Sequence, residues 1–261
     1  MASPLRPDRP RFPAPTETPE LGRRELLASL AAAALSAGGL PVGRLFAEEP
    51  KKEPASPSTS VEPKWRPLFD GKTLKNWKES EFGGAGSVKV EEGHILIGQG
   101  EPLTGITWEG PALPKIDYEV RLQGQRVDGD DFFCALTFPV KEAPCSLVLG
   151  GWGGGLVGLS SLNGYDASEN ETTSYYQFDK KKWYAIRLVV LDGRILAWID
   201  DKRMVNVDTT GTKISIRIEV DACRPFGICT FRTLGAIKDL KVRELAKDEV
   251  AKLHKEAEVE Q

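Results

Sequence analysis

The chain has 261 residues, with 35 Lys and Arg against 38 Asp and Glu and a formal net charge of −3. The two signs are interspersed, so nucleic acid is not an expected partner, because a phosphate backbone requires a basic face. Only two His are present, His94 and His254, which excludes a multi-histidine metal site and leaves acid–base or metal chemistry to carboxylates.

Residues 1–47 are typical of a twin-arginine export signal. Arg23 and Arg24 precede an apolar stretch rich in Ala and Leu that ends near Leu40. The alternative is a membrane anchor, but the stretch is shorter than the ~20 residues that span a bilayer. We expect cleavage after Ala47, delivery to the periplasm or another extracytoplasmic compartment, and no stable membrane insertion afterwards.

Three further segments follow the signal. Residues 48–64 have too little apolar content for a core and are expected to be a disordered linker. Residues 65–245 are expected to form the folded domain, and residues 246–261 a charged tail that could be helical.

The pattern of the domain predicts strands. Apolar and polar residues alternate over 118–123 and again over 214–220, and residues 183–190 and 194–200 flank a short Asp-Gly turn typical of a hairpin. Alternation with period two indicates sheets that bury one face. Many short strands of this kind, with turns between them, predict an all-β sandwich or barrel.

The four cysteines have different expected roles. Cys134 falls in an apolar alternation and is expected to be a buried thiol. Cys223 and Cys229 flank a turn and could face each other as a disulfide in an oxidising compartment. Spacing alone leaves their state, and that of Cys145, open.

The opening of the domain carries a family motif, Leu68-Phe69-Asp70-Gly71-Lys72-Thr73-Leu74 followed by Trp77. This motif resembles the start of the 3-keto-disaccharide hydrolase domain family. Further similar stretches follow in the family's order: 90–96, 183–187, 199–202, 226–228 and 236–242. The resemblance implies an all-β, antiparallel two-sheet β-sandwich of the concanavalin A-like jelly-roll type, and a carbohydrate-active hydrolase or lyase that cleaves 3-keto-glycosides. Together with the export signal, it predicts an exported enzyme of that kind. A sugar or glycoside is then the expected ligand.

The chain departs from the family in the middle of the domain. Residues 129–134 stand where the family usually carries an Asn-Ser-Gly motif, and residues 145–152 with a Gly-rich excursion replace a Tyr-Glu pair. A jelly roll hosts enzymes and binding modules alike. A non-catalytic carbohydrate- or cell-surface-binding module is therefore the alternative function, and a structural envelope protein without a small ligand is a third.

Cleavage of a 3-keto-glycoside requires a base near C2 and a cation or donor at the ketone oxygen. Glu219 is our candidate base and Arg217 its electrostatic partner, because residues two apart on a predicted strand share its solvent-facing side. The alternative is a solvated ion pair that contributes little.

Two neighbouring segments supply further candidates. Asp131, as a catalytic residue, and Asp130, as a binding residue, could hold sugar hydroxyls or a divalent cation, or could simply form a turn. Trp152 lies among glycines and could stack on a sugar or fill the core. The glycines around it form a literal G-x-G-x-x-G, but no helix follows, so dinucleotide binding is rejected.

The remaining binding candidates are second choices. Asn170 and Glu171 belong to a polar segment that could form a sugar-contacting rim, hold a cation, or simply be solvated. Glu119 and Arg121 are expected on the solvent-facing side of their strand, by the argument used for Arg217 and Glu219.

Overall fold

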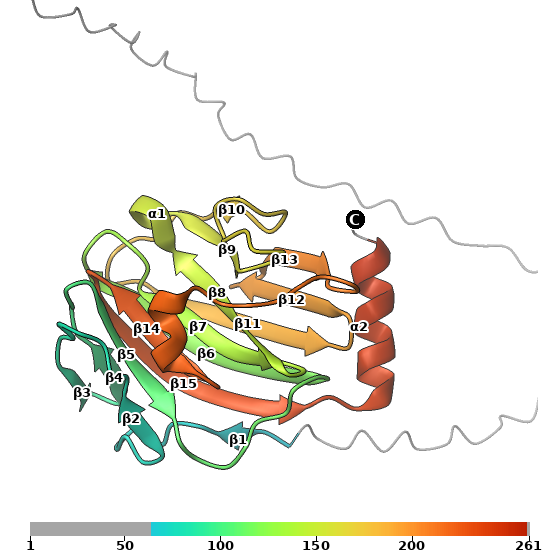
Figure 1. The fold of residues 1–261 in the computed structure, drawn as a ribbon. Coiled ribbons are helices and arrows are strands. Elements are labelled where there is room, and N and C mark those ends of the chain that lie inside the picture. The colour runs from blue at the N-terminus through green and yellow to red at the C-terminus, as the bar shows by residue number, and fades with distance from the viewer. Residues whose placement is uncertain (1–63, 260–261) are drawn as a thin grey trace, which may run out of the picture. The chain divides into compact units, whose positions relative to one another are not determined.

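The computed structural model describes residues 64–259, which form two packed antiparallel sheets with a helix at the C-terminal end (Figure 1). The fold is therefore the expected all-β jelly-roll sandwich. The predicted signal over 1–47 and almost all of the predicted linker over 48–64 lie outside the described residues. No helix within 64–259 is long and apolar enough to cross a membrane.

One layer is an eight-stranded sheet in the order β13-β12-β11-β6-β15-β4-β3, with β1 also paired to β15. Its strands are β1 (Arg66–Pro67), β3 (Val88–Glu91), β4 (His94–Ile97), β6 (Tyr118–Asp128), β11 (Trp183–Leu191), β12 (Arg194–Ile199), β13 (Lys202–Asp208) and β15 (Leu234–Glu244). The predicted hairpin around Asp192 is confirmed as the β11–β12 pair.

The other layer is a seven-stranded sheet in the order β10-β9-β8-β7-β14-β5-β2. Its strands are β2 (Trp77–Glu79), β5 (Leu103–Trp108), β7 (Cys134–Val140), β8 (Ala143–Gly150), β9 (Leu156–Ser160), β10 (Ser174–Tyr175) and β14 (Gly227–Phe231). The short helices α1 (Gly151–Gly154) and η1 (Ile218–Cys223) interrupt the strands, and α2 (Lys247–Val259) follows them.

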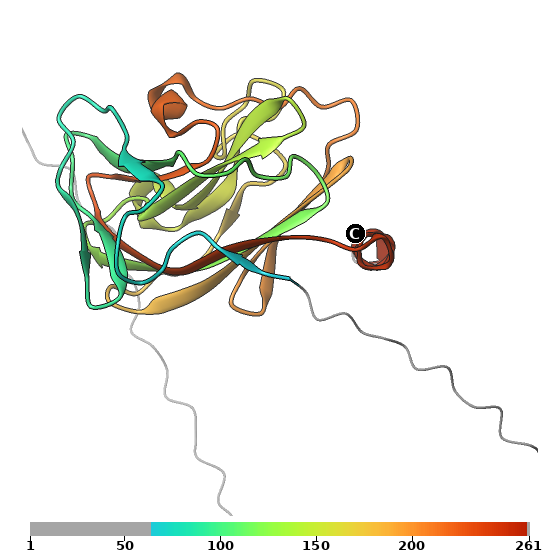
Figure 2. The same ribbon diagram turned by 90° about the horizontal axis from the view of Figure 1, so that it is seen from below.

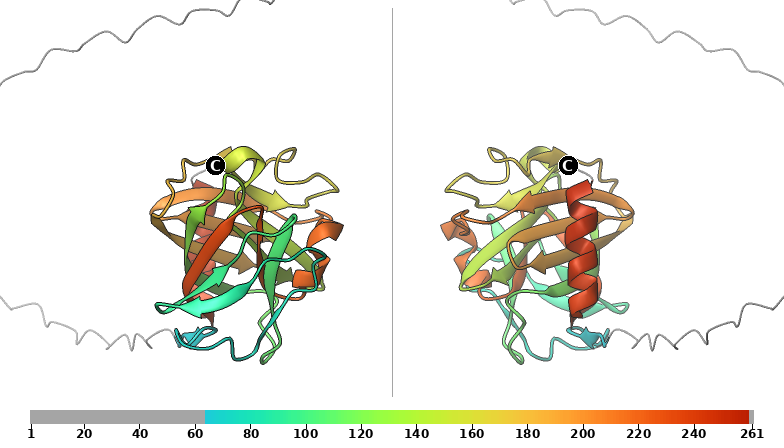
Figure 3. Two further views of the ribbon diagram at one scale, coloured as in Figure 1. Left: turned by 90° about the vertical axis from the view of Figure 1, so that its left-hand side faces the viewer. Right: turned by 90° about the vertical axis from the view of Figure 1, so that its right-hand side faces the viewer.

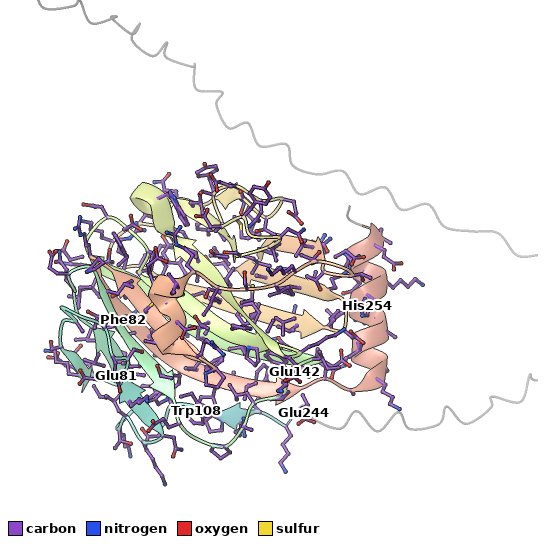
Figure 4. All side chains as sticks on the ribbon, viewed as in Figure 1. Glu81, Phe82, Trp108, Glu142, Glu244 and His254 are labelled. Carbon is purple, nitrogen blue, oxygen red and sulfur yellow. The ribbon has the colours of Figure 1, made fainter. Side chains whose placement is uncertain are left out.

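The core fills the space between the two sheets (Figure 4). Tyr118, Val120 and Leu122 point inward from β6, as their alternation predicts, and Cys134 is a fully buried thiol. The buried Tyr118 hydroxyl donates to the Pro139 carbonyl at 2.7 Å, so the ring adds apolar area without an unpaired polar atom.

The outer faces of the two sheets are covered by different elements. On the eight-stranded sheet, α2 packs Leu253 and Ala257 against Val189, Leu191 and Leu196 (Figure 3). On the seven-stranded sheet, η1 and the segment before it lie outside the layer (Figure 2). The second arrangement leaves a cavity lined by four of the nine candidate residues singled out from the sequence.

Candidate functional site

The floor of the cavity is the outer face of the seven-stranded sheet. Ala135 pairs with Val148 across β7 and β8, and Ser146 pairs with Ser160 across β8 and β9. Their neighbours Leu136, Leu147 and Leu159 point into the core. Because the outward side chains are small, this part of the sheet leaves room above it.

The segment before η1 crosses this face and forms one wall. Ser161 and Ser215 exchange backbone hydrogen bonds at 2.6 and 3.0 Å, and the Thr107 hydroxyl donates to the Ala222 carbonyl at 2.7 Å. Val220 is buried against the sheet. The covering segment is thereby fixed at both ends.

The predicted strand over residues 214–220 is wrong. Ile214 makes only an isolated bridge to Leu162, and the chain turns into η1 at Ile218, whose side chain is 86% exposed. The strand β14 is already paired with β7 on one side and β5 on the other, so this segment finds no open sheet edge beside β14. The alternating residues cover a sheet face instead of forming a strand.

The cavity between the floor and this wall measures about 290 Å³. Its lining includes Arg217, Glu219, Asp131 and Trp152, which come from three separate parts of the chain. All three predicted catalytic residues and the predicted stacking aromatic thus line one cavity. Arg217 and Glu219 do so from a loop and a 3₁₀ helix, not from the strand that suggested them.

Arg217 links two carboxylates at the edge of the cavity. Its Nη1 donates to Oδ2 of Asp166 at 2.6 Å, and its Nη2 donates to Oε1 of Glu219 at 2.8 Å. The hydrogen bond from Arg217 lowers the pKa of Glu219 below its ordinary 4.5, and the same bond raises the pKa of Arg217. Glu219 is therefore ionised at neutral pH, as a base must be.

Asp166 is held more tightly than Glu219. Burial acts to raise its pKa, but hydrogen bonds from Ser168 and Arg217 outweigh burial and lower it. Only 17% of its side chain is exposed, against 53% for Glu219. Asp166 thus positions Arg217, while Glu219 remains accessible to a ligand.

Asp131 is oriented by backbone N–H groups. Oδ1 accepts from the Phe132 amide at 2.7 Å and Oδ2 accepts from the Gly153 amide at 3.3 Å. The second contact joins the carboxylate to the glycine excursion that carries Trp152. Each oxygen retains lone pairs for a ligand hydroxyl.

Trp152 lies in the Gly-rich segment of residues 150–155, the excursion noted in the sequence. Its side chain is 47% exposed at the cavity, and its backbone has φ of 47°, in the left-handed region. The sequence left open whether Trp152 stacks on a sugar or fills the core. The structure shows that Trp152 is an exposed aromatic residue and not part of the core.

Arg126 holds the excursion in place. Its guanidinium donates to four carbonyl oxygens, at distances from 2.7 to 3.4 Å, those of Asp131, Gly150, Gly154 and Phe178. Burial lowers the pKa of Arg126, and a Cβ added at Gly150, where φ is 79°, would collide with its Nη2. This backbone clamp keeps Trp152 and the Gly153 amide beside Asp131.

Arg126 was not among the predicted site residues, although the sequence contains a signal for it. The inward-facing positions of β6 include Leu122, Gly124 and Arg126. Arg126 is thus a charged residue at a position where the alternation predicts a buried apolar one. A buried arginine at such a position must find acceptors, and here it finds backbone carbonyls.

Glu119 and Arg121 lie away from the cavity, on the outer face of the other sheet. Glu119 is fully buried and binds Arg121, Arg187 and Arg243, with N–O distances from 2.6 to 2.9 Å. The expectation of a solvent-facing Glu119 is wrong because α2 covers this end of the sheet and Glu249 of α2 also binds Arg243. Burial opposes its ionisation, but the three arginines outweigh burial and lower the pKa of Glu119.

The other binding candidates are also outside the cavity. Asp130 is exposed and pairs with Lys180 at 3.2 Å. Asn170 is occupied within its own loop: its amide nitrogen donates to three carbonyls and its oxygen accepts from Thr172. Glu171 is exposed and does not line the cavity.

The described residues bring no three His, Cys, Asp or Glu side chains together as a metal site. Cys134, Cys145, Cys223 and Cys229 are buried free thiols. Burial raises the pKa of Cys134 and Cys145 to about 12, so neither is a nucleophile at neutral pH.

Similar folds occur among solved structures. The carbohydrate-binding module CBM66 from Bacillus subtilis is 13% identical, with a TM-score of 0.41, over 65% of this chain and 96% of its own. Domain 4 of AbnA, a GH43 extracellular arabinanase from Geobacillus stearothermophilus, is 14% identical, with a TM-score of 0.44, over 68% and 87%. Crh5 transglycosylase is 9% identical, with a TM-score of 0.48, over 70% and 84%.

No curated protein sequence matches the chain significantly. Residues 64–221 match the family described as the 3-keto-alpha-glucoside-1,2-lyase-like domain. The matched range includes Asp131, Trp152, Arg217 and Glu219, and it agrees with the resemblance of the opening motif. The chain therefore belongs to the 3-keto-alpha-glucoside-1,2-lyase-like domain family.

Proposed function

We propose that this domain cleaves glycosides whose sugar ring carries a ketone at C3, by elimination across C1 and C2. The observation that carries the proposal is the convergence of Glu219, Arg217 and Asp131 on one cavity of a chain in this family. A pocket on which a few charged side chains converge is the default candidate for a ligand-binding or active site.

The proposed reaction begins at the C2 proton, which the neighbouring ketone makes acidic. The Glu219 carboxylate removes this proton, and the C–H electrons form an enolate with its charge on the C3 oxygen. The C1–O bond then breaks and the aglycone oxygen leaves with the electron pair. It takes up the proton that Glu219 accepted, which restores the carboxylate, and a double bond remains between C1 and C2. Addition of water to that bond gives the free 3-keto sugar.

Arg217 and Asp131 have separate proposed roles. Within the described part of the chain, Arg217 makes its hydrogen bonds through Nη1 and Nη2 with one acceptor each, so further N–H groups remain to stabilise the enolate oxygen. Asp131 accepts hydrogen bonds from sugar hydroxyls and thereby orients the ring. Trp152 stacks on the ring's C–H face.

The test uses the purified domain from Glu48 onward with 3-keto-trehalose and with trehalose, followed by mass spectrometry of the released sugars. We expect release from the keto sugar only, and loss of that release in Glu219→Gln. The melting temperature should change little, because an exposed ion pair contributes little to stability. Glu109→Gln, which alters an exposed glutamate paired with Lys78, is the matched control and should retain activity.

Absence of release from every 3-keto-glycoside tested, 3-keto-trehalose included, with and without added divalent cations, would overturn the enzymatic proposal. A large stability loss in Glu219→Gln would show that Glu219 is structural.

A non-catalytic sugar-binding module is the second candidate. It is favoured by the half-exposed Trp152 on its fixed excursion and by the ion pairing that makes Glu219 a weaker base. In that case intact glycosides would bind without cleavage, and Trp152→Ala would weaken binding more than Glu219→Gln.

We also propose that residues 1–47 export the protein by the twin-arginine route to the periplasm. The support is the Arg23-Arg24 pair before a short apolar stretch. Replacing both arginines by lysine should retain the protein in the cytoplasmic fraction of an expressing bacterium. Unchanged delivery to the periplasm would contradict this route.

A further inference from the structure

The interior of the cavity is apolar although its edge is charged. The side chains away from Arg217 and Glu219 are mainly Leu103, Phe132, Ala135, Val148, Val220 and Phe231. Phe132 and Phe231 face each other with ring centroids 5.6 Å apart and planes inclined at 43°. An unsubstituted sugar placed among them would lose water from its hydroxyls without gaining partners.

The hydroxyl groups of the cavity floor already have hydrogen-bond partners. Ser146 is hydrogen-bonded to Thr137 at 2.9 Å, and Ser160 to Ser161 at 3.3 Å. Both floor serines are almost fully buried. Because they are buried and already hydrogen-bonded within the protein, these serines do not form a set of polar groups for a sugar.

The charged groups lie at the edge, where about half of each Arg217 and Glu219 side chain is exposed. A ligand that satisfies both regions has a polar ring at the edge and an apolar substituent inside. In a 3-keto-glycoside the leaving group is attached at C1, next to the C2 carbon that must face Glu219. A ring positioned for proton removal can thus direct its aglycone into the cavity.

We infer that the preferred substrates are 3-keto-glycosides with an apolar, monocyclic aglycone, not 3-keto-disaccharides; this inference rests on the proposed function. The volume is consistent with that size, because a cavity of about 150 Å³ lined by aliphatic and aromatic residues accepts benzene and this one measures about 290 Å³. The tilted Phe132 and Phe231 rings provide aromatic walls for such a group.

The test compares the 3-keto derivatives of benzyl α-glucoside, methyl α-glucoside and trehalose. Benzyl and methyl alcohols are leaving groups of similar basicity, so a difference between them reports the cavity and not the chemistry of the bond. Dissociation constants are measured on Glu219→Gln, which holds the substrates intact, and kcat/KM on the natural sequence. We expect benzyl to exceed both other substrates at least tenfold in affinity and in kcat/KM.

Two variants test whether the preference arises in this cavity. Ala135→Leu fills the floor and should reduce the benzyl-to-methyl ratio to near one, because it removes the space that the benzyl group needs and the methyl group does not. Val148→Thr keeps the side-chain shape, replaces one methyl group by a hydroxyl and should reduce the ratio less. The melting temperatures of both are measured, and Val148→Thr serves if Ala135→Leu does not fold.

The outcomes separate the two claims. Turnover of 3-keto-trehalose equal to or faster than that of the benzyl compound would overturn this inference and leave the proposed function intact. Absence of turnover for all three would overturn the proposed function. In that case tighter binding of the benzyl compound would still support the apolar subsite, and equal binding would overturn it.

Discussion

At the scale of single residues, the pair Arg217 and Glu219 makes the site dependent on pH. The pKa of Glu219 is lowered below 4.5 by its hydrogen bond from Arg217. The proposed base is ionised above its pKa, so activity should be present at neutral pH and lost as the pH falls through that lowered value. Ionisation therefore does not limit the reaction in the physiological range.

Replacing Arg217 by Met should change both the pH profile and the rate. Without the guanidinium the pKa of Glu219 rises toward 4.5, so the acid limb of kcat/KM should move to higher pH. At neutral pH Glu219 remains ionised, and a fall of about 10²–10³ in kcat/KM would then report lost stabilisation of the enolate. Arg224→Met is the control, because Arg224 pairs with Asp221 in the same 3₁₀ helix and does not line the cavity. An unmoved acid limb would show that Arg217 does not control the base.

At the scale of elements, the position of α1 depends on Arg126 more than on its own sequence. Five glycines among residues 150–155 have little intrinsic preference for one conformation. The hydrogen bonds from Arg126 to carbonyls on both sides of Trp152 supply the missing restraint. An interior residue of the sandwich thereby positions a residue of the site.

Arg126→Met should lower the free energy of unfolding by about 2–4 kcal/mol, because buried carbonyls would lose their donors. It should also speed hydrogen exchange at the amides of residues 150–155 and weaken ligand binding. Lys180→Met removes a surface cation that pairs with Asp128 and Asp130 and should change stability by less than about 0.5 kcal/mol. Unchanged exchange in Arg126→Met would show that the excursion is held by other contacts.

At the scale of the whole molecule, the last two strands complete both sheets. The strand β14 lies between β7 and β5, and β15 lies between β6 and β4. Both follow residue 221, where the family match ends, and β15 makes its longest pairing with β6. The matched range by itself therefore lacks a central strand of each layer.

A fragment of residues 64–221 should be unfolded, because the edges of β5 and β7 in one sheet, those of β4 and β6 in the other, and the core would face water. A fragment of residues 64–245 keeps every strand of both sheets and loses only α2. It should fold with reduced stability, since Val189, Leu191 and Leu196 lose the helix that covers them. Circular dichroism and urea unfolding of the two fragments would test this. A cooperative transition in the shorter fragment would contradict the role assigned to the last two strands.

The sequence by itself determined the class of fold, the hairpin around Asp192, the inward face of β6 and the family. These follow from period-two alternation, turn residues and a local motif, which are properties of neighbouring residues. It also singled out Asp131, Trp152, Arg217 and Glu219, without showing that they lie together.

Only the tertiary structure decided which of the candidate residues share a cavity. Residues 214–220 have the alternation of a strand, yet no open sheet edge lies beside β14, so they cover a face. Glu119 alternates like a solvent-facing residue, but α2 buries it among arginines. Alternation specifies which side of the chain is apolar. What covers that side depends on segments distant in sequence, because burial is a property of the packed chain and not of one strand.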